Sequence, residues 1–310
     1  MDSGRQFETR GQYAEASREL EAALQVVKGY PADARGFLSR MELGGVSASA
    51  GQYIEAERWD NEALRQGTEL YGKQSSALAV PLGNLASLYR DQGDYTRAEE
   101  YCRRALQLAT EESATAQAAR ANVLGVLGGI LSVEGKLENA EESLEQSIQI
   151  AKKLPAGSGI LAADWSNLAG LYAKTGRDNQ ALALYRDAYA LCEKTGGSSD
   201  PNLFFILAGM AAIQAHSGKY ADAVSSIQSA IRLWEAGEPT TTLQLRDALL
   251  AQAEWLHKLK RDPEAKRVKA RAAQVAKAAN QNSYAQYTVD ARQISQGMVD
   301  HTETGNPVLQ

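Results

Sequence analysis

An all-α, right-handed superhelical solenoid of about seven antiparallel helix–turn–helix repeats is the fold expected from this chain. Words that begin with glycine (GQY, GQY, GDY, GKL, GRD and GKY) recur every 40 to 42 residues, and alanine stands five residues after each of these glycines. Composition agrees, because alanine, leucine, glutamate and glutamine are abundant and only 7 of the 310 residues are proline. Such a period is typical of arrays in which each unit packs only on its neighbours.

Each repeat is expected to consist of two helices joined at one turn residue. The turn residues are Gly11, Gly51, Gly93, Gly135, Gly176, Gly218 and, in the last repeat, Lys260. Apolar or small residues lie 11, 8, 7 and 4 positions before the turn residue, and 2, 5, 9 and 12 positions after it. Both spacings follow one face of an amphipathic helix, so we expect a first helix before the turn and a second helix after it.

Two positions in every repeat carry only small residues. Seven positions before the turn stand Gly4, Gly44, Ala86, Gly128, Ala169, Ala211 and Ala253, and five after it stand Ala16, Ala56, Ala98, Ala140, Ala181, Ala223 and Ala265. Small side chains at these positions let the two helix axes approach closely while larger ones fill the gaps beside them. We therefore predict the solenoid over residues 1–279.

The two ends of the chain differ from the middle. Between Lys258 and Lys277 lie eight Lys or Arg against two acidic residues, which predicts a capping unit with a solvated basic face; docking to an acidic partner or to nucleic acid is the alternative. Residues 280–310 are polar and are expected to form a partly disordered tail. The first repeat has a shortened first helix, with only ten residues before Gly11.

Charge and composition bear on partners and location. Lys plus Arg is 33 and Asp plus Glu is 38, a net charge of −5 that argues against general nucleic-acid binding. The longest apolar stretches, residues 121–133 and 203–213, are expected to be too short to cross a membrane. The polar N-terminus and two unpaired cysteines predict a cytoplasmic protein, with a signal peptide upstream of the shortened first repeat as the alternative.

No catalytic, cofactor or metal motif is found in the sequence. The stretch GILSVEGK at residues 129–136 resembles a phosphate loop, but its spacing is wrong and the repeat accounts for it. The three histidines are scattered without ligand spacing. We therefore expect a protein that is not an enzyme and that holds no cofactor and no metal.

Two segments carry a family resemblance. NLASLYRDQGDYTRAEEYCRRALQLA (residues 84–109) and DWSNLAGLYAKTGRDNQALALYRDAYAL (residues 164–191) resemble tetratricopeptide repeats (TPR). Units of about 42 residues with an NLA-x-LY first helix are similar to the repeats of kinesin light chains. The resemblance implies a non-catalytic scaffold for protein–protein interaction, with first helices that line a concave groove for a partner segment. The alternative is a regulatory sensor that binds a small peptide or ligand and changes its superhelical pitch.

The groove is expected to contain residues 13, 10, 9, 6, 3 and 2 positions before each turn. Positions −10 and −6 carry mostly small residues, so that either a ligand approaches closely or neighbouring first helices pack tightly there. The resemblance places the asparagine of NLA in the groove. The polar candidates on the groove floor are Asn84, Arg90, Asn122, Asn167, Lys174 and His216. Two of them, Arg90 and Lys174, are cations that would suit an acidic segment of a partner protein, and we expect neither nucleic acid nor membrane as a partner.

Overall fold

The computed structural model describes residues 13–27, 34–49, 52–111, 113–154, 159–196, 200, 202–236 and 243–278, and all regular structure in these ranges is helical. The chain divides into two compact units, Met1–Pro239 and Thr240–Gln310. The all-α helical-repeat fold predicted from the glycine period is confirmed.

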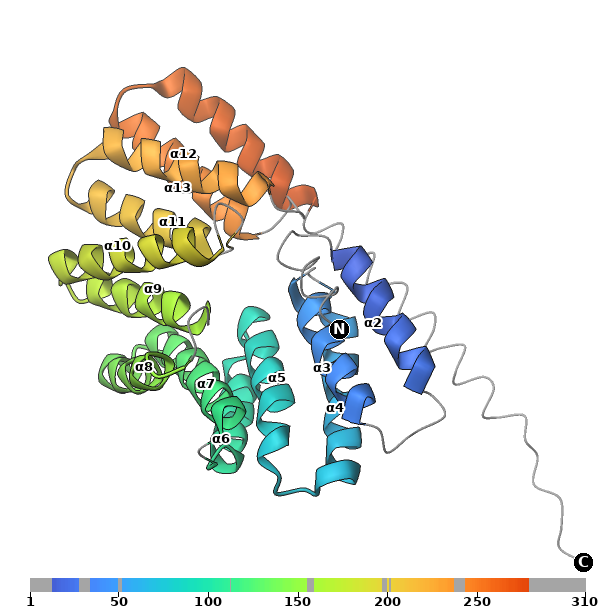
Figure 1. Cartoon of the computed structure of the whole chain (residues 1–310). Coiled ribbons are helices and arrows are strands. Elements are labelled where there is room, and N and C mark those ends of the chain that lie inside the picture. The colour runs from blue at the N-terminus through green and yellow to red at the C-terminus, as the bar shows by residue number, and fades with distance from the viewer. Residues whose placement is uncertain are drawn as a thin grey trace, which may run out of the picture. The chain divides into compact units, whose positions relative to one another are not determined.

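The first unit is a stack of helical hairpins (Figure 1). Its helices are α2 (Tyr13–Val27), α3 (Ala34–Ser49), α4 (Tyr53–Tyr71), the short 3-10 helix η1 (Ser76–Leu78), α5 (Ala79–Asp91), α6 (Tyr95–Leu108), α7 (Ala114–Val133), α8 (Leu137–Ala151), α9 (Gly159–Lys174), α10 (Asp178–Thr195), α11 (Asn202–His216) and α12 (Tyr220–Ala236). The hairpins are α3–α4, α5–α6, α7–α8, α9–α10 and α11–α12, and α2 packs on α3. The first helices α3, α5, α7, α9 and α11 also pack on one another in chain order, so they form a continuous layer.

The turns use the left-handed backbone conformation that the glycines were expected to supply. Gly93, Gly135, Gly176 and Gly218 have φ between 73° and 80°. After Gly93 the amide of Asp94 donates to the carbonyl of Tyr89 at 2.8 Å, and each of the other three turns closes with the same bond. In the last repeat Lys260 adopts φ 61° without being glycine. The turns predicted at Gly11 and Gly51 lie outside the described residues.

The small residues bring the helices of each hairpin together as predicted. The alanines five positions after the turn, from Ala56 to Ala223, are fully buried. Ala86, Ala169 and Ala211, seven positions before it, are fully buried too. A Cβ on Gly128 would lie 2.6 Å from Leu144 Cγ on the facing helix, so the α7–α8 contact has no room for a side chain at residue 128. Close helix approach therefore explains the constant small residues.

One apolar helix is longer than its sequence pattern indicated. The stretch expected at residues 121–133 belongs to α7, which runs from Ala114 to Val133 over 20 residues. By length and composition, with a mean hydropathy of 1.2, this helix could cross a membrane, so the expectation that the stretch is too short was wrong. In the structure α7 packs against α5, α6, α8 and α9, and 56% of its apolar window is buried. A core helix of a solenoid meets the same criteria.

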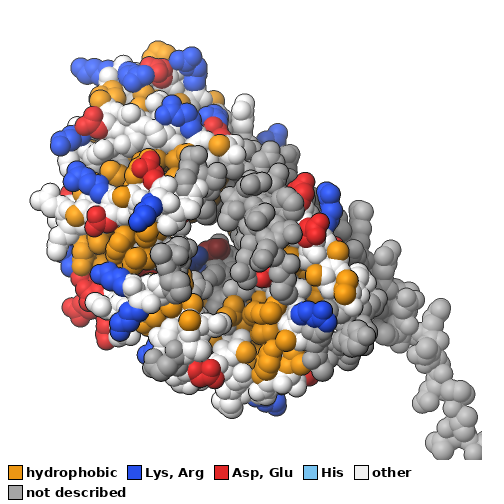
Figure 2. Space-filling view, viewed as in Figure 1, with side chains coloured by type: hydrophobic (Ala, Val, Ile, Leu, Met, Phe, Trp, Pro, Cys, Tyr) orange, Lys and Arg blue, Asp and Glu red, His pale blue; other side chains and the backbone are white. Residues whose placement is uncertain are grey.

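The second unit contains α13 (Leu243–Lys258) and a helix over residues 262–278. On α13 Leu256 and Trp255 are buried, and on the following helix Ala272 and Val275 are buried. The cations of the predicted capping unit are exposed, among them Lys266 and Lys269, and Lys and Arg side chains stand out from this part of the molecule in Figure 2. The predicted tail at residues 280–310 lies outside the described residues.

Candidate functional site

One line of positions on the first helices of the first unit is half-buried or exposed wherever its burial is described, with one exception. These positions lie 13, 9, 6 and 2 residues before the turn, and steps of four, three and four residues follow one face of a helix. We call them the open stripe. On α5 they are Val80, Asn84, Ser87 and Asp91, and on α9 they are Ala163, Asn167, Gly170 and Lys174. Within the described residues Val126 is the member of the stripe that is buried.

The position ten residues before the turn is buried in the three middle repeats. Gly83, Gly125 and Ser166 are buried, so the expectation that they face a groove was wrong, whereas Met41 and Ala208 at the same position are half-buried. A Cβ on Gly83 would lie 3.0 Å from Val123 of the next first helix, and a Cβ on Gly125 would lie 2.2 Å from Asp164 Oδ1 of the next one. Small residues stand here because adjacent first helices pack on them.

The residues six positions before the turn are small for another reason. They are Gly45, Ser87, Gly129, Gly170 and Ala212. Among the described residues, a Cβ on Gly45 would meet no atom outside its own helix neighbourhood within 4 Å. A Cβ on Gly129 would come no closer than 4.0 Å to Arg90, and one on Gly170 no closer than 3.5 Å to Tyr185. These three helical glycines therefore have room for a side chain that the sequence does not supply.

The position thirteen residues before the turn forms an apolar edge of the stripe. It carries Leu38, Val80, Asn122, Ala163 and Phe205. Leu38 is 40% exposed and Phe205 is 46% exposed. The edge is therefore apolar except at Asn122, in its middle.

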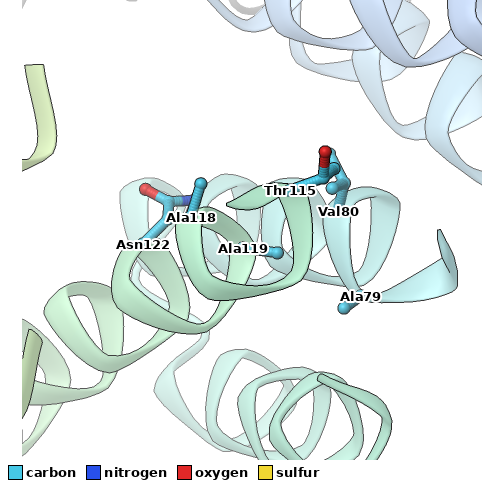
Figure 3. Close-up of a pocket in the computed structure, with 6 residues that line it drawn as sticks. All are labelled: Ala79, Val80, Thr115, Ala118, Ala119 and Asn122. Atoms are coloured by element: carbon cyan, nitrogen blue, oxygen red, sulfur yellow. The ribbon is translucent and has the colours of Figure 1, made fainter. Parts of the chain in front are cut away.

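A shallow pocket of about 220 Å³ lies on this edge between α5 and α7. It is lined by Ala79, Val80, Thr115, Ala118, Ala119 and Asn122. In Figure 3 Asn122 and Ala118 point to the same side of α7, and Thr115 lies beside Val80. Small side chains leave this space open, and the Asn122 amide is its largest polar group.

Asn84 is held by a buried carboxyl group rather than left free. Its Nδ2 donates to Asp60 Oδ1 at 3.0 Å, across the junction between α5 and α4. Asp60 is 1% exposed and lies against Gly44, where a Cβ would be 2.4 Å from Oδ1. Burial raises the pKa of Asp60 to about 7, while the bond from Asn84 acts in the opposite direction. Asn84 thus joins the open stripe to a buried polar contact.

The other predicted residues differ in how freely their polar groups reach solvent. Asn122 and Asn167 are exposed on the stripe. Arg90 pairs with its neighbour Asp91 at 2.9 Å, at the edge of the stripe. Lys174 Nζ donates to the hydroxyl of Ser132 at 3.1 Å, and His216 lies 3.6 Å from Asp178.

The structure thus places five of the six predicted residues on the open stripe and the sixth, Arg90, beside it. They are spread along the stack on α5, α7, α9 and α11, and they do not form a compact cluster. Such an arrangement suits an elongated ligand rather than a small molecule held at a single point. The described ranges contain no group of three or more His, Cys, Asp or Glu residues that could hold a metal ion.

Four overlapping stretches of the chain, residues 37–111, 77–153, 117–194 and 159–236, match the tetratricopeptide repeat family. Together they cover residues 37–236, well over half of the chain. The chain belongs to the tetratricopeptide repeat family. The predicted family is thereby confirmed. Among curated proteins, none matches the chain.

Solved structures share the TPR fold. BtubC (BKLC) from P. vanneervenii is 16% identical with a TM-score of 0.56, and the match covers 74% of this chain and 91% of that one. A tetratricopeptide repeat protein from Parabacteroides merdae is 18% identical with a TM-score of 0.52, covering 88% and 91%. A putative kinesin light chain from Podosopora anserina with nearly identical TPR-like repeats is 20% identical with a TM-score of 0.46, covering 63% and 93%.

TPR proteins are in general scaffolds for protein–protein interaction and are generally non-catalytic, and this is the function that family membership indicates here.

Repeats of this family need contacts that hold one hairpin on the next. In this TPR chain two such contacts combine a glutamate, a tyrosine and an arginine.

At the junction of α4 and α5 the hydroxyl of Tyr89 donates to Glu57 Oε1 at 2.5 Å, and the guanidinium of Arg97 lies 4.3 Å from the centre of the Tyr89 ring. Burial and Glu57 raise the pKa of Tyr89, so the hydroxyl keeps its proton. At the junction of α8 and α9 Arg177 lies over Tyr172 at 3.9 Å and binds both oxygens of Glu141 at 2.7 and 2.8 Å.

Two buried aspartates were missed in the sequence, Asp60 on α4 and Asp164 on α9. The sequence did contain an indication that Asp60 is unusual, because Asp60 stands nine positions after the turn, on the apolar face of the second helix. Other repeats carry Leu20, Leu144 and Ile227 at that position, so a charged group there breaks the apolar pattern. Asp164 breaks no such pattern, because its position lies at the N-terminal end of the first helix, where the repeats vary.

Proposed function

We propose that the open stripes of successive first helices form a groove that binds an extended segment of a partner protein. The observation that supports this most directly is the set of helical glycines Gly45, Gly129 and Gly170. Glycine inside a helix costs about 0.5–1 kcal/mol relative to alanine. At these positions no neighbouring atom requires the absence of a Cβ. The missing side chain therefore does not improve packing at these positions, but it leaves the helix backbone accessible to a ligand.

The rows beside the glycines give the proposed groove two different edges. The apolar edge, with Leu38 and Phe205, offers anchoring points for apolar side chains of the partner. Nine positions before the turn, Asn84 and Asn167 offer amide groups that can donate to and accept from an extended backbone. Two positions before the turn, Lys174 supplies a cation, and Arg90 stands next to that row.

The spacing of the rows sets the length of the segment. Neighbouring helices lie about 8–10 Å apart, and an extended chain rises about 3.3 Å per residue, so each repeat would meet about three residues of the partner. The row from Leu38 to Phe205 crosses four such steps. A partner segment of about 12 residues would therefore fill the proposed groove, with an acidic residue opposite Lys174 or Arg90.

The test places large side chains at two open glycines of the proposed groove and leaves the residues of the hydrophobic core unchanged. We expect the double variant Gly129→Leu with Gly170→Leu to keep the helical circular dichroism of the wild type and to lose the proteins captured from a lysate. The matched control is Ala183→Leu, since Ala183 is a small exposed residue on the second helix α10. Capture that survives the double variant and is lost with the control would overturn the proposal.

A charge reversal tests the chemistry of the segment. We expect Arg90→Glu with Lys174→Glu to weaken capture of the same partner, and to weaken it most at low salt, where charge–charge attraction is least screened. If the charge reversal leaves capture unchanged while the double leucine variant abolishes it, the groove remains the binding site. That result would contradict the proposal that the bound segment is acidic.

A further inference from the structure

A buried carboxyl group lies where three helices of the TPR stack meet. Asp164 stands on α9, is 2% exposed, and faces Ser147 of α8 and Gly125 of α7. Gly125 leaves the space that the carboxyl group occupies, because a Cβ there would lie 2.2 Å from Asp164 Oδ1. The group is thus built into the junction between the hairpins α7–α8 and α9–α10.

A count of hydrogens shows which protonation state fits this site. Ser147 Oγ lies 2.6 Å from the carbonyl oxygen of Ala121 and 2.5 Å from Asp164 Oδ2. A hydroxyl group carries one hydrogen, and a carbonyl oxygen carries none. If the hydroxyl donates to Ala121, the second short contact is a hydrogen bond only when Asp164 supplies the proton. The geometry therefore fits a neutral carboxylic acid that donates to Ser147, which in turn donates to Ala121.

Within the described residues no charged side chain pairs with the Asp164 carboxyl group. The other charged residues and histidines of α9 and of the helices packed on it are Lys174 on α9, Arg120 on α7, Glu138, Glu141, Glu142 and Glu145 on α8, Asp178, Arg186, Asp187, Glu193 and Lys194 on α10, and His216 on α11. Glu141 is bound to Arg177, and Lys174 to Ser132 at the far end of its helix. Burial raises the pKa of Asp164 to about 7 and the bond with Ser147 lowers it, and none of these charged groups contributes.

We propose that Asp164 is a proton-dependent latch between the α7–α8 and α9–α10 hairpins: as a neutral acid it closes the junction, and as a carboxylate it loosens it. Loss of the proton leaves one hydroxyl hydrogen for two acceptors and places an unpaired charge among buried groups. Closed and loosened junctions would present the neighbouring Asn167 and Gly170 differently. The latch itself does not depend on the proposed partner groove.

The buried Asp60 is the natural comparison within the same chain. It is as deeply buried as Asp164 and also lies against a glycine, but its partner Asn84 donates through Nδ2. A carboxylate at residue 60 therefore keeps its hydrogen bond, whereas a carboxylate at residue 164 competes with Ala121 for the hydrogen of Ser147. The switching behaviour is expected to be stronger at the α7–α9 junction.

The sign of the pH effect follows from the raised pKa. An exposed aspartate in the opened junction titrates near 3.8 and the closed one near 7, so the closed state holds the extra proton between these values. Opening then becomes about tenfold more favourable for each unit of pH between 4 and 7. Above pH 7 both states are ionised and the effect levels off.

Hydrogen exchange of α8 and α9 amides between pH 5 and 8.5, corrected for intrinsic exchange rates, tests the latch. We expect wild-type protection in α8 and α9 to fall as the pH approaches 7, with α5 and α6 changing less. Asp164→Asn supplies a neutral donor to Ser147 at every pH, so its protection should be independent of pH and exceed that of the wild type at pH 8. The control Asp187→Asn replaces an exposed aspartate of α10 and should follow the wild type.

Two results would overturn the latch. One is an Asp164→Asn profile that falls with pH as the wild type does. The other comes from carbon-13 NMR of aspartate-labelled protein, in which Asp60 and Asp164 should both titrate above pH 6 and only the Asp164 signal should shift in Ser147→Ala. If no aspartate signal that titrates above pH 6 responds to Ser147→Ala, the proposal is refuted even if Asp164→Asn fails to fold.

Discussion

Alanine at the three open glycines six positions before the turn should make this TPR protein more stable, although several other glycines of its first helices have no room for a side chain. The change is Gly45→Ala with Gly129→Ala and Gly170→Ala. Each alanine removes the helix penalty of glycine, about 0.5–1 kcal/mol. The added methyl groups come no closer than 3.5 Å to atoms outside their own helix neighbourhood, so no clash offsets the gain.

The three sites lie on different first helices and share no side-chain partner, so their effects should add. The free energy of unfolding should rise by about 1.5–3 kcal/mol for the triple variant. At about 2–4 °C per kcal/mol for a domain of this size, the melting temperature should rise by roughly 3–12 °C. Thermal denaturation followed by circular dichroism at 222 nm measures the shift.

Matched controls come from two glycines that lie against another helix. In Gly125→Ala the new Cβ would be 2.2 Å from Asp164 Oδ1, and in Gly209→Ala it would be 2.1 Å from the hydroxyl oxygen of Tyr185. Overpacking of this kind costs about 1–3 kcal/mol, so both variants should melt below the wild type. A triple variant that melts as low as these controls would refute the distinction between open and packed glycines.

The same triple variant separates stability from function. If the open glycines serve a ligand, the stabilised protein should bind its partner more weakly, a trade-off that is common at binding sites. A more stable protein with unchanged capture would show that the backbone at these positions is not contacted, and the partner would have to lie elsewhere on the stripe.

Three further substitutions test the packing of the repeats. Ala98→Leu should cost about 1–3 kcal/mol, because Ala98 is fully buried between α5 and α6, and an unchanged melting curve would contradict the repeat alignment. Tyr89→Phe removes the hydroxyl group that donates a hydrogen bond to Glu57 at 2.5 Å, so the free energy of unfolding measured by urea denaturation should fall by about 1–2 kcal/mol. Glu57→Gln should lower it by less. Lys260→Gly should stabilise the second unit by about 1 kcal/mol, since its φ of 61° suits glycine, and hydrogen-exchange protection of residues 243–278 should rise.

The hairpin architecture could be predicted from the sequence because it depends on local and repeated features. The left-handed turn at Gly93, the close contact at Ala98 and the amphipathic spacing recur in nearly every unit, so each repeat supports the interpretation of the next. Lys260 shows the limit of the rule, since the turn persists there without glycine. The packing of the two helices imposes the left-handed backbone geometry, and glycine lowers the conformational energy of adopting it.

The open stripe could be predicted only in part, because small residues look alike in a sequence. Gly125 and Gly129 stand on the same helix and differ by one turn, yet one is pressed against Asp164 and the other faces open space. Their difference depends on where the next first helix crosses α7, and that crossing is set by contacts between repeats. Asn84 is a similar case, since its bond to Asp60 joins residues 24 positions apart.

Two hairpins of the stack combine the same departures from plain apolar packing. The α3–α4 hairpin contains the open Gly45 and the buried Asp60, and the α9–α10 hairpin contains the open Gly170 and the buried Asp164. Helical glycine and a buried carboxyl group each lower the stability of a solenoid that could use alanine and leucine instead. A repeat array whose only requirement was to fold would remove such costs. Their recurrence is a physical argument for the two proposals, that the open glycines serve a partner and that a buried carboxyl group controls the junction beside them.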